Sequence, residues 1–334
     1  KEDRLARLAA NGGNEKCEEA VVKALDWLQA TQHKDGSWGG GHRVAMTGLA
    51  LLAYLGHCET PLSEKYGDTV TNAIVYLVNV GMKHKGRLAT DFKGNAYVYE
   101  HGIATYALAE AYTFCKQLGV NLPNLHEVVR DAGQTIIDGQ NPAGGWDYQF
   151  KESRRNDTSV MGWCMQALKA CEHTGIEYRN LRKCIREGLN AIEGNQASSG
   201  VIGYTSASQK GDGTTLSAVG ALCYQMHGKS THSVPRRACT WVDKHIKCNW
   251  AGADTDLYGH YYASQAMMNH GGAAWKRYNE LFRDETLNNQ NADGSFKMPG
   301  NRGHGLNNQH FVTCLATLML EVYYRFLPGT GQKN

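Results

Sequence analysis

The stretch Leu25–Gly40, LDWLQATQHKDGSWGG, decides the fold of this chain, because its pattern recurs along the sequence. An amphipathic run ends at a glutamine, Gln32, and a tryptophan, Trp38, follows six positions later behind a glycine turn. The same spacing recurs at Gln140 and Trp146 and at Gln290 and Phe296, and a looser copy holds Gln196, Gly203 and Tyr204. A pattern that returns in this way indicates a chain built from structural repeats.

An apolar, small-residue-rich run follows each copy and has the length of a helix. Six such runs begin at Ala45, His101, Asp157, Thr215, Asp256 and His310, so successive starts lie 56, 56, 58, 41 and 54 residues apart. Amphipathic partners lie between them, as in CEEAVVKALDWLQ, where Val21, Leu25 and Leu28 recur at the spacing of one helix face. The sequence therefore predicts six helical hairpins.

The two helices of each hairpin differ in polarity, which predicts their place in the fold. A helix that is apolar nearly all round is expected inside, and one with a polar stripe is expected to face solvent. An open solenoid needs polar terminal caps, yet the last hairpin ends in the apolar run LATLMLEVYYRFLP. We therefore expect an all-α fold, an α/α toroid (α6/α6 barrel) of six hairpins. Residues 15–328 would form this single domain, between an N-terminal arm (1–14) and a C-terminal tail (329–334).

Composition excludes few function classes. The 334 residues are 42% hydrophobic and 20% charged, with a formal net charge of +3 that favours no particular partner. The basic residues are scattered, and the nearest cluster, Lys151–Arg155, is interpreted as a solvated loop, so nucleic acid is not an expected partner. No apolar run approaches the roughly twenty residues of a membrane span, so we expect a soluble chain. Its oligomeric state is not indicated.

The start of the chain and its cysteines leave the compartment open. The chain begins at Lys1 without a methionine, which favours a trimmed N-terminus and leaves an exported protein, periplasmic or secreted, as an alternative. The 10 cysteines form no Cys-x-x-Cys pair, and several lie in apolar runs, where a buried free thiol is expected. No metal and no cofactor is predicted.

The glutamine and the tryptophan are interpreted as structural. A turn between two helices must satisfy free carbonyls at one end and free amides at the next, and a glutamine side chain carries both a donor and an acceptor. A large aromatic ring after a glycine turn can cover the helix end and shield those bonds. We therefore expect each pair to fasten neighbouring helices together.

These residues carry a resemblance to a known family. Gln32, Gly36 and Trp38, and again Gln140, Gly144 and Trp146, resemble the QW motif of squalene and oxidosqualene cyclases. The hairpin repeat is also similar to the β subunits of protein prenyltransferases, and the resemblance extends from about Glu15 to Leu327. It implies the toroid of the terpenoid cyclase and prenyltransferase superfamily, although fold alone does not fix function.

The candidate site is the mouth where the inner helices begin. Parallel inner helices gather their N-termini around one end of a central cavity, where a ligand site is expected. The residues that open those helices are His42, Arg43, Glu100, His101, Asn156, Asp157, Thr214, Thr215, Asp254, Asp256, Asn308 and His310. We expect Asp157, Asp254, Asp256 and His310 to be catalytic. We expect ligand binding by His42, Arg43, Glu100, His101 and Asn156, and by the aromatic residues Trp163, Tyr258 and Tyr261, whose faces suit cationic intermediates or sugar rings. For each acid, helix capping is the alternative.

The resemblance is incomplete at the residues that would carry chemistry. Class II cyclases use an Asp-x-Asp-Asp-Thr motif whose middle Asp donates a proton, and the corresponding stretch here is RRNDTS. Asp157 and Thr158 match its last two positions, while Asn156 stands at the donor position and an amide cannot donate that proton. Prenyltransferases bind zinc through an Asp, a Cys two residues later and a His, and here Ser159 replaces the Cys, so a tight zinc site is not expected.

The sequence leaves three classes of function open. The first is a squalene cyclase/prenyltransferase-like protein that binds or converts an isoprenoid or another lipidic substrate in the central cavity. The second is a polysaccharide-processing toroid, a glycosidase or lyase, with a wet cleft. The third is a non-enzymatic interaction module. The polarity of the cavity discriminates best between the first two, because a lipid needs apolar walls whereas a saccharide needs converging acids, histidines and arginines.

Overall fold

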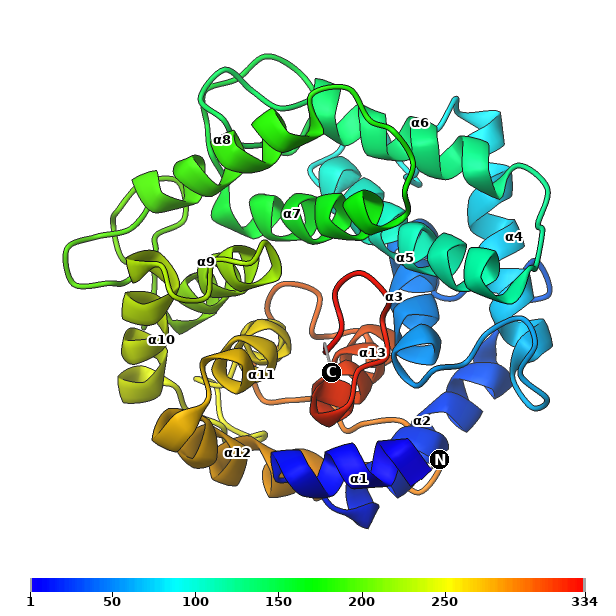
Figure 1. Ribbon diagram of the computed structural model, residues 1–334. Coiled ribbons are helices and arrows are strands. Elements are labelled where there is room, and N and C mark those ends of the chain that lie inside the picture. Colours follow the sequence, from blue (N-terminus) through cyan, green and yellow to red (C-terminus); the bar gives the residue numbers. More distant parts are fainter. Residues whose placement is uncertain (1, 333–334) are drawn as a thin grey trace.

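The chain forms two concentric rings of helices. The computed structural model describes residues 2–332, which hold thirteen α-helices, one short 3-10 helix and no β-strand. The outer ring consists of α2 (Glu15–Thr31), α4 (Gly67–Lys83), α6 (Leu125–Asp138), α8 (Leu181–Gly194), α10 (Ser233–His245) and α12 (Gly272–Leu287). The inner ring consists of α3 (Arg43–Gly56), α5 (Tyr97–Leu118), α7 (Thr158–His173), α9 (Thr214–Met226), α11 (Leu257–His270) and α13 (Gln309–Leu320). Figure 1 shows both rings, and the predicted all-α toroid of six hairpins is confirmed.

Burial explains why these helices divide into two rings. In α3 every residue after Arg43 is buried, whereas α8 buries only one stripe that includes Ile185, Leu189 and Ile192. Small residues let the inner helices pack closely, since a Cβ added to Gly48 would lie 3.2 Å from the Cα of Ala104 in α5. The apolar character of the inner helices and the polar stripe of the outer ones therefore set their places.

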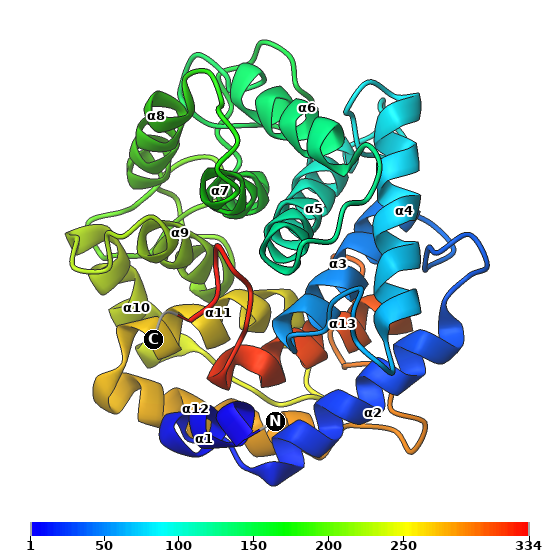
Figure 2. The same cartoon turned by 45° about the vertical axis from the view of Figure 1, so that its right-hand side comes forward.

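The last hairpin packs against the first and closes the ring. Helix α13 packs against α3, α2 and α11, and α12 also contacts α2. One hydrogen bond across this junction joins His310 in α13 to the carbonyl oxygen of Met46 in α3, at 2.9 Å. Figure 2 shows α13 and α3 side by side, as in Figure 1. Closure removes the exposed apolar ends that an open solenoid would need to cap.

The repeated glutamines link each outer helix to the next. Gln32 Nε2 donates to the carbonyl of Gly36 (3.0 Å) in its own turn and to that of Thr69 (3.0 Å) in α4. The second bond recurs in the other three copies, from Gln140 to Cys184 in α8, from Gln196 to Val234 in α10 and from Gln290 to Ala20 in α2. The predicted structural role of these glutamines is confirmed, and the fourth copy spans the ring closure.

The tryptophan and the glycine of the same turn have separate roles. Trp38 Nε1 donates to the carbonyl of Leu28 at the end of α2 (2.8 Å), and Trp146 Nε1 donates to that of Ile136 in α6 (2.9 Å). Gly36 has a φ of +93°, and a Cβ there would lie 2.2 Å from the carbonyl oxygen of Asn72 in α4. Glycine is therefore required both for the left-handed turn and for the close approach of the next helix.

The chain's C-terminal segment fills the mouth opposite the inner-helix N-termini. After η1 (Glu321–Tyr323) it turns into the centre of the ring, as the red trace in Figure 1 shows. The amides of Gly329 and Thr330 donate to the carboxylate of Glu110 in α5 (2.9 and 3.3 Å), and the hydroxyls of Thr330 and Tyr106 lie 2.6 Å apart. Of the predicted tail, residues 333–334 lie outside the described residues.

The predicted N-terminal arm contains a helix that packs on the outer ring. Residues 2–11 form α1 (Glu2–Asn11), and residue 1 lies outside the described residues. The carbonyl of Asn11 accepts from Trp275 Nε1 of α12 (3.1 Å), and the carbonyl of Gly12 accepts from Asn279 and Arg283 of the same helix (2.9 Å each). The arm is thus fastened to the last outer helix.

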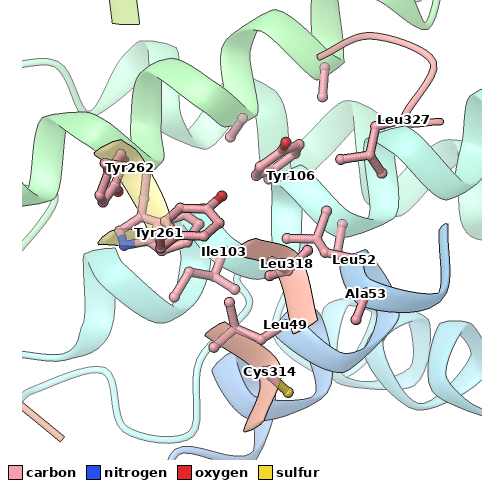
Figure 3. Close-up of a cluster of buried hydrophobic side chains, with 14 of the residues drawn as sticks. Leu49, Leu52, Ala53, Ile103, Tyr106, Tyr261, Tyr262, Cys314, Leu318 and Leu327 are labelled. Carbon is pink, nitrogen blue, oxygen red and sulfur yellow. The ribbon is translucent and has the colours of Figure 1, made fainter. Parts of the chain in front are cut away.

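The middle of the barrel is packed with side chains. Figure 3 shows a cluster of buried side chains that includes Leu49 of α3, Ile103 of α5, Tyr261 of α11, Leu318 of α13 and Leu327 of the C-terminal segment. These side chains fill the middle of the barrel, and the large cavity lies at the end where the inner helices begin.

Two further findings bear on the sequence predictions. All ten cysteines are free thiols, and eight of them are buried. Over residues 2–332, none of the helices combines the length and the apolar character needed to cross a bilayer.

Candidate functional site

A cavity of about 880 Å³ opens where the N-termini of the six inner helices meet. Residues of all six of these helices, or of the loops that enter them, form its wall. Six of the predicted site residues line it: His42, Glu100, Trp163, Asp254, Asp256 and Tyr258. Thr214, Thr215 and Asn308 do so as well. The other six predicted residues, Arg43, His101, Asn156, Asp157, Tyr261 and His310, are not part of the lining.

Glu100 lines the cavity, but its carboxylate is used to join helix ends. Oε2 accepts from the amide of Ala45 (3.0 Å) in the first turn of α3 and from the hydroxyl of Thr90 (2.9 Å), and Oε1 accepts from the amide of Thr90 (3.1 Å). His42 Nδ1 lies 3.5 Å from the same carboxylate. The acid satisfies an otherwise free helix amide and is 1% exposed, so its role is structural.

Asp254 and Asp256 are the predicted catalytic residues that lie in the cavity wall. Asp256 caps α11 through the amide of Tyr258 (3.1 Å), and its second oxygen accepts from the hydroxyl of Thr215 (2.8 Å) in α9. The side chain of Asp254 is 55% exposed and lies 3.4 Å from Lys247 Nζ. Asp256 is therefore a fixed carboxylate with a capping role, whereas Asp254 is a solvated one.

Asp157 is buried behind the cavity wall as the N-cap of α7. Its Oδ1 accepts from the amides of Ser159 (3.0 Å) and Val160 (3.3 Å), and Arg155 Nη1 lies 3.0 Å from Oδ2. Burial raises the pKa of Asp157 above its usual value, and hydrogen bonds from Tyr204 and the cap amides, with the Arg155 charge, oppose that rise. Its predicted place at the mouth is corrected, because the side chain is wholly buried in a cap.

His101 and His310 are neutral buried rings that join helices. Leu88 donates its amide to His101 Nδ1 (3.0 Å) and the Nε2 atom lies 2.9 Å from the carbonyl of Ala132, which fixes the Nε2–H form. His310 Nε2 makes the corresponding bond to Met46 (2.9 Å) and its ring stacks on Trp38. Burial lowers the pKa of both rings to about 4. Their predicted place at the cavity is corrected, because both rings point into the protein.

The remaining three predicted residues also face away from the cavity. Arg43 is directed toward Asp35 outside it, with Nη1 to Oδ2 at 3.7 Å. The amide nitrogen of Asn156 donates to the carbonyl of Ala143 (3.1 Å), so its side chain belongs to the loop before α7. Tyr261 donates to Gln166 Oε1 (2.8 Å) within the packed barrel. None of the three is part of the cavity lining, so the predicted contacts with a ligand are corrected.

Aromatic side chains form much of the cavity wall. Six of them line it, namely Tyr99, Tyr148, Trp163, Tyr204, Tyr258 and Phe311. The hydroxyl of Tyr258 accepts from Trp163 Nε1 (2.9 Å), which fixes both rings. The deeper wall includes apolar side chains from the first two helical turns, Met46 of α3 and Ile103 of α5. The cavity therefore combines an apolar floor with aromatic walls and a polar rim.

Tyr148, Tyr204 and Phe311 line the cavity although none of them was predicted as a site residue. Tyr204 is the aromatic residue of the loosest repeat copy and Tyr148 lies two residues after Trp146, so both belong to loops whose interpretation was structural. The signal that could have found them is their place in the loops that lead to α7 and α9 and, for Phe311, in the first turn of α13. Among residues 2–332, the structure brings together no group of three or more His, Cys, Asp or Glu side chains able to hold a metal ion.

Comparisons with known proteins bear mainly on the fold. No known family profile matches the chain. It is 26% identical to squalene–hopene cyclase of Alicyclobacillus acidocaldarius over 197 residues, which are 54% of this chain and 28% of that protein. The chain thus spans little more than a quarter of the length of the curated relative it matches.

Solved structures show the same architecture over nearly the whole chain. The α-1,6-mannanase GH76A of Salegentibacter sp. HEL1_6 superposes with a TM-score of 0.65 at 9% identity, over 91% of this chain and 98% of that one. Type II terpene cyclase MstE from Scytonema superposes with a TM-score of 0.60 at 12% identity, over 92% and 98%. The chain therefore has the α/α toroid fold that these terpene cyclases and glycosidases share.

Proposed function

We propose that this protein is a squalene cyclase/prenyltransferase-like toroid that binds an isoprenoid or another lipidic molecule in the mouth of its inner ring. The observation that carries the proposal is the cavity itself, with aromatic walls above an apolar floor. Its volume of about 880 Å³ falls within the range of roughly 300–1,000 Å³ that is usual for small-molecule sites. The likeness to squalene–hopene cyclase supports the same ligand class.

The shape of the cavity suits a ligand with a long apolar part. The packed barrel closes the cavity from below, so an apolar chain that enters the mouth is removed from water on several sides. Burial of apolar area stabilises by about 25 cal/mol per Å², and aromatic faces add attraction to cationic or unsaturated carbon centres. These walls would therefore bind an isoprenoid chiefly through its hydrocarbon part.

Conversion of the ligand would depend on Asp254 and Asp256, the carboxylates in the wall. We infer that Asp256 is the better candidate acid, because Thr215 and the α11 amide hold it in one orientation, while Asp254 is solvated and pairs with Lys247. The QW-like turns would then serve the scaffold. In this chain Asn156 stands where the class II cyclase motif has its proton-donating Asp, so proton-initiated cyclisation is not part of the proposal.

One observation favours a saccharide as the second candidate ligand. Asp212, Asp254 and Asp256 all reach the cavity together with tyrosine rings, and such a combination can bind sugar hydroxyls and sugar faces. The histidines and arginines predicted to converge there instead turn away or pair with other residues. The apolar floor formed by residues such as Met46, Ile103 and Leu216 favours the lipidic ligand.

The test is equilibrium binding of two ligand classes to the full chain. Tritiated geranylgeraniol delivered from cyclodextrin and a mannose oligosaccharide would be titrated by equilibrium dialysis. We expect saturable binding of the isoprenoid at one site per chain and none of the saccharide. Saturable binding of the saccharide alone would overturn the proposal in favour of the second candidate, and binding of neither would favour an interaction module.

A matched pair of variants would localise the binding. Leu216→Trp adds bulk to a side chain in the cavity wall, whereas Leu118→Trp adds the same bulk to an exposed side chain at the end of α5. The first should abolish isoprenoid binding and the second should leave it unchanged. Equal affinities of both folded variants would place the ligand outside this cavity.

A further inference from the structure

Two tyrosines of the cavity wall belong to a cluster of five residues, which we call the tyrosine–arginine cluster. It consists of Asp147, Tyr148, Arg155, Asp157 and Tyr204. Four of these residues belong to the segment between α6 and α7, and Tyr204 belongs to the loop that leads to α9. Both tyrosines line the cavity, while Asp157 lies wholly buried behind them. The cluster thus presents only two polar hydroxyl groups, from two different repeats, to a ligand.

The protons of both hydroxyl groups are used inside the cluster. The hydroxyls of Tyr148 and Tyr204 hydrogen-bond to each other, and Arg155 Nη2 donates to Tyr148 (3.4 Å). The Tyr204 hydroxyl also interacts with the carboxylate of Asp157, where its proton opposes the rise in the pKa of that acid. Because Asp157 only accepts, Tyr204 donates to it and Tyr148 donates to Tyr204. Each phenol has one proton and two lone pairs, so what remains for a ligand is acceptor capacity.

The positive charge of Arg155 is neutralised within the cluster. Arg155 Nη1 forms ion pairs with both Asp147 and Asp157, the latter at 3.0 Å. Its guanidinium carbon also lies 4.7 Å from the ring centre of Tyr148 and 5.0 Å from that of Tyr204. An arginine held by two carboxylates and two ring faces has little capacity left for a phosphate group.

Two other basic side chains of the cavity wall lie beside carboxylates, and a third lies on a ring face. Lys247 lies 3.4 Å from Asp254, and His42 lies 3.5 Å from Glu100. Lys210 lies over the ring of Tyr204, with Nζ 4.1 Å from the ring centre. Strong phosphate sites present several donors, and those that use a divalent cation need converging carboxylates, of which the described residues form no such group. The wall is therefore poorly suited to an anionic headgroup.

We propose that the ligand is a neutral isoprenoid alcohol whose hydroxyl group donates a hydrogen bond to the Tyr148–Tyr204 pair while its hydrocarbon chain lies against the apolar floor. This inference rests on the proposed function and narrows its ligand class. It assigns the two tyrosines as specificity-determining residues that recognise the ligand without taking part in bond making. It separates an alcohol from a diphosphate, for which the wall offers no converging set of charged donors, and from a pure hydrocarbon, which cannot use the acceptor capacity of the two hydroxyls.

Depth in the helices supports this orientation. Ile103 and Trp163 lie in the second turns of α5 and α7, while Tyr148 and Tyr204 lie in loops that precede inner helices. The hydroxyl pair is therefore nearer the opening than the apolar floor is. A ligand that enters tail first would place its polar end at the tyrosines.

The experiment compares four probes of similar chain type on the full-length wild-type chain. They are geranylgeraniol, its methyl ether, geranylgeranyl diphosphate and squalene. The ether keeps the oxygen but has no proton to donate, so it isolates the donor direction of the inferred bond. Because one hydrogen bond contributes about 0.5–1.5 kcal/mol, we expect the alcohol to bind up to about tenfold more tightly than the ether and squalene, with the diphosphate weakest.

Conservative variants then locate the acceptor. Tyr204→Phe and Tyr148→Phe should each lower the affinity for the alcohol several-fold and leave that for the ether unchanged, so that the preference for the alcohol disappears. Tyr112→Phe, at a half-buried tyrosine of α5 outside the cavity lining, should change neither affinity. Circular dichroism and thermal melting of each variant would establish that it is folded before its affinities are compared.

The outcomes distinguish this inference from the proposed function. Equal affinities of the alcohol, the ether and squalene would overturn the hydroxyl anchor while isoprenoid binding itself stands. Tightest binding of the diphosphate would overturn the inferred neutrality. Absence of binding for all four probes would overturn the proposed function and this inference together.

Discussion

Gln290, in the last repeat, donates its side-chain amide to the backbone carbonyl of Ala20 in the first outer helix, at 2.8 Å, across 270 positions of sequence. The same amide donates to Gly294 in its own turn (3.0 Å). The bond that joins neighbouring repeats elsewhere in the ring thus also joins the two ends of the repeat series.

Replacement of Gln290 should weaken ring closure. Gln290→Leu removes both hydrogen bonds and leaves two carbonyls without that donor, so we expect a loss of about 1–3 kcal/mol in the free energy of unfolding. Urea unfolding followed by circular dichroism measures it. Gln134→Leu, whose amide bonds at an exposed position within and beside α6, should cost less. Equal losses would show that the closure bond has no special weight.

The glycine of the same turn should tolerate no side chain. Gly294 has a φ of +96°, and a Cβ there would lie 2.1 Å from the carbonyl oxygen of Lys23 in α2. We expect Gly294→Ala to lower the melting temperature far more than Gly228→Ala, since Gly228 has a φ of +76° but open space around it. The difference isolates the clash from the cost of the left-handed conformation. Similar melting temperatures for the two variants would contradict the close packing between repeats.

Acid should destabilise the protein partly through His310. Burial lowers the pKa of this ring to about 4, whereas the unfolded ring titrates near 6.5. Between these values the unfolded state binds more protons, so stability falls as the pH drops from 6.5 to 4, by on the order of 3 kcal/mol at most. His310→Gln, which keeps a donor near Met46, should show a shallower fall in melting temperature over that range. His126→Gln, at an exposed position, is the control and should follow the wild type.

Glu110, which holds the C-terminal segment, should make the stability depend on pH in the direction opposite to that of His310. Burial raises the pKa of Glu110 to about 7, from a model-peptide value of 4.5, although Gly329 and Thr330 donate to its carboxylate. The folded state therefore binds more protons between these values, and stability falls as the pH rises from 4.5 to 7. Relative to the wild type, Glu110→Gln should gain melting temperature from pH 5 to pH 8. Limited proteolysis after Leu327 offers a second readout, and a pH-independent difference would show that Glu110 does not titrate there.

Much of the ring could be predicted from residue patterns. The inner helices begin within a few residues of the predicted starts, because runs such as Ala45–Gly56 are apolar on every face and can lie only inside. The role of the repeated glutamines as links between helices could be predicted, because a glutamine side chain can donate to and accept from the free backbone groups at helix ends. Which helix each glutamine reaches was not predictable, because it depends on the register between repeats.

The sequence could predict where the candidate site lies but not which of the nearby polar residues line it. A polar residue on an apolar helix can face the cavity or bridge to a neighbouring backbone carbonyl, and periodicity does not separate these cases. His101 and His310 belong to the second case. Each ring hydrogen-bonds to a backbone carbonyl of another helix, and burial lowers its pKa so that the ring is neutral. Tyr148 and Tyr204 reached the wall through loops, whose path no helical period describes.

Closure of the ring has a consequence for how the chain can be connected. Every hairpin packs between two neighbours, and the last hairpin contacts the first, so no repeat acts as an obligatory start or end of the series. A circularly permuted chain, with the old ends joined by a linker and new ones opened in the exposed loop around Gly228, would keep every contact between repeats except those of the C-terminal segment. The order in which the hairpins are synthesised would then affect the folding pathway, and the contacts between repeats in the folded toroid would not depend on it.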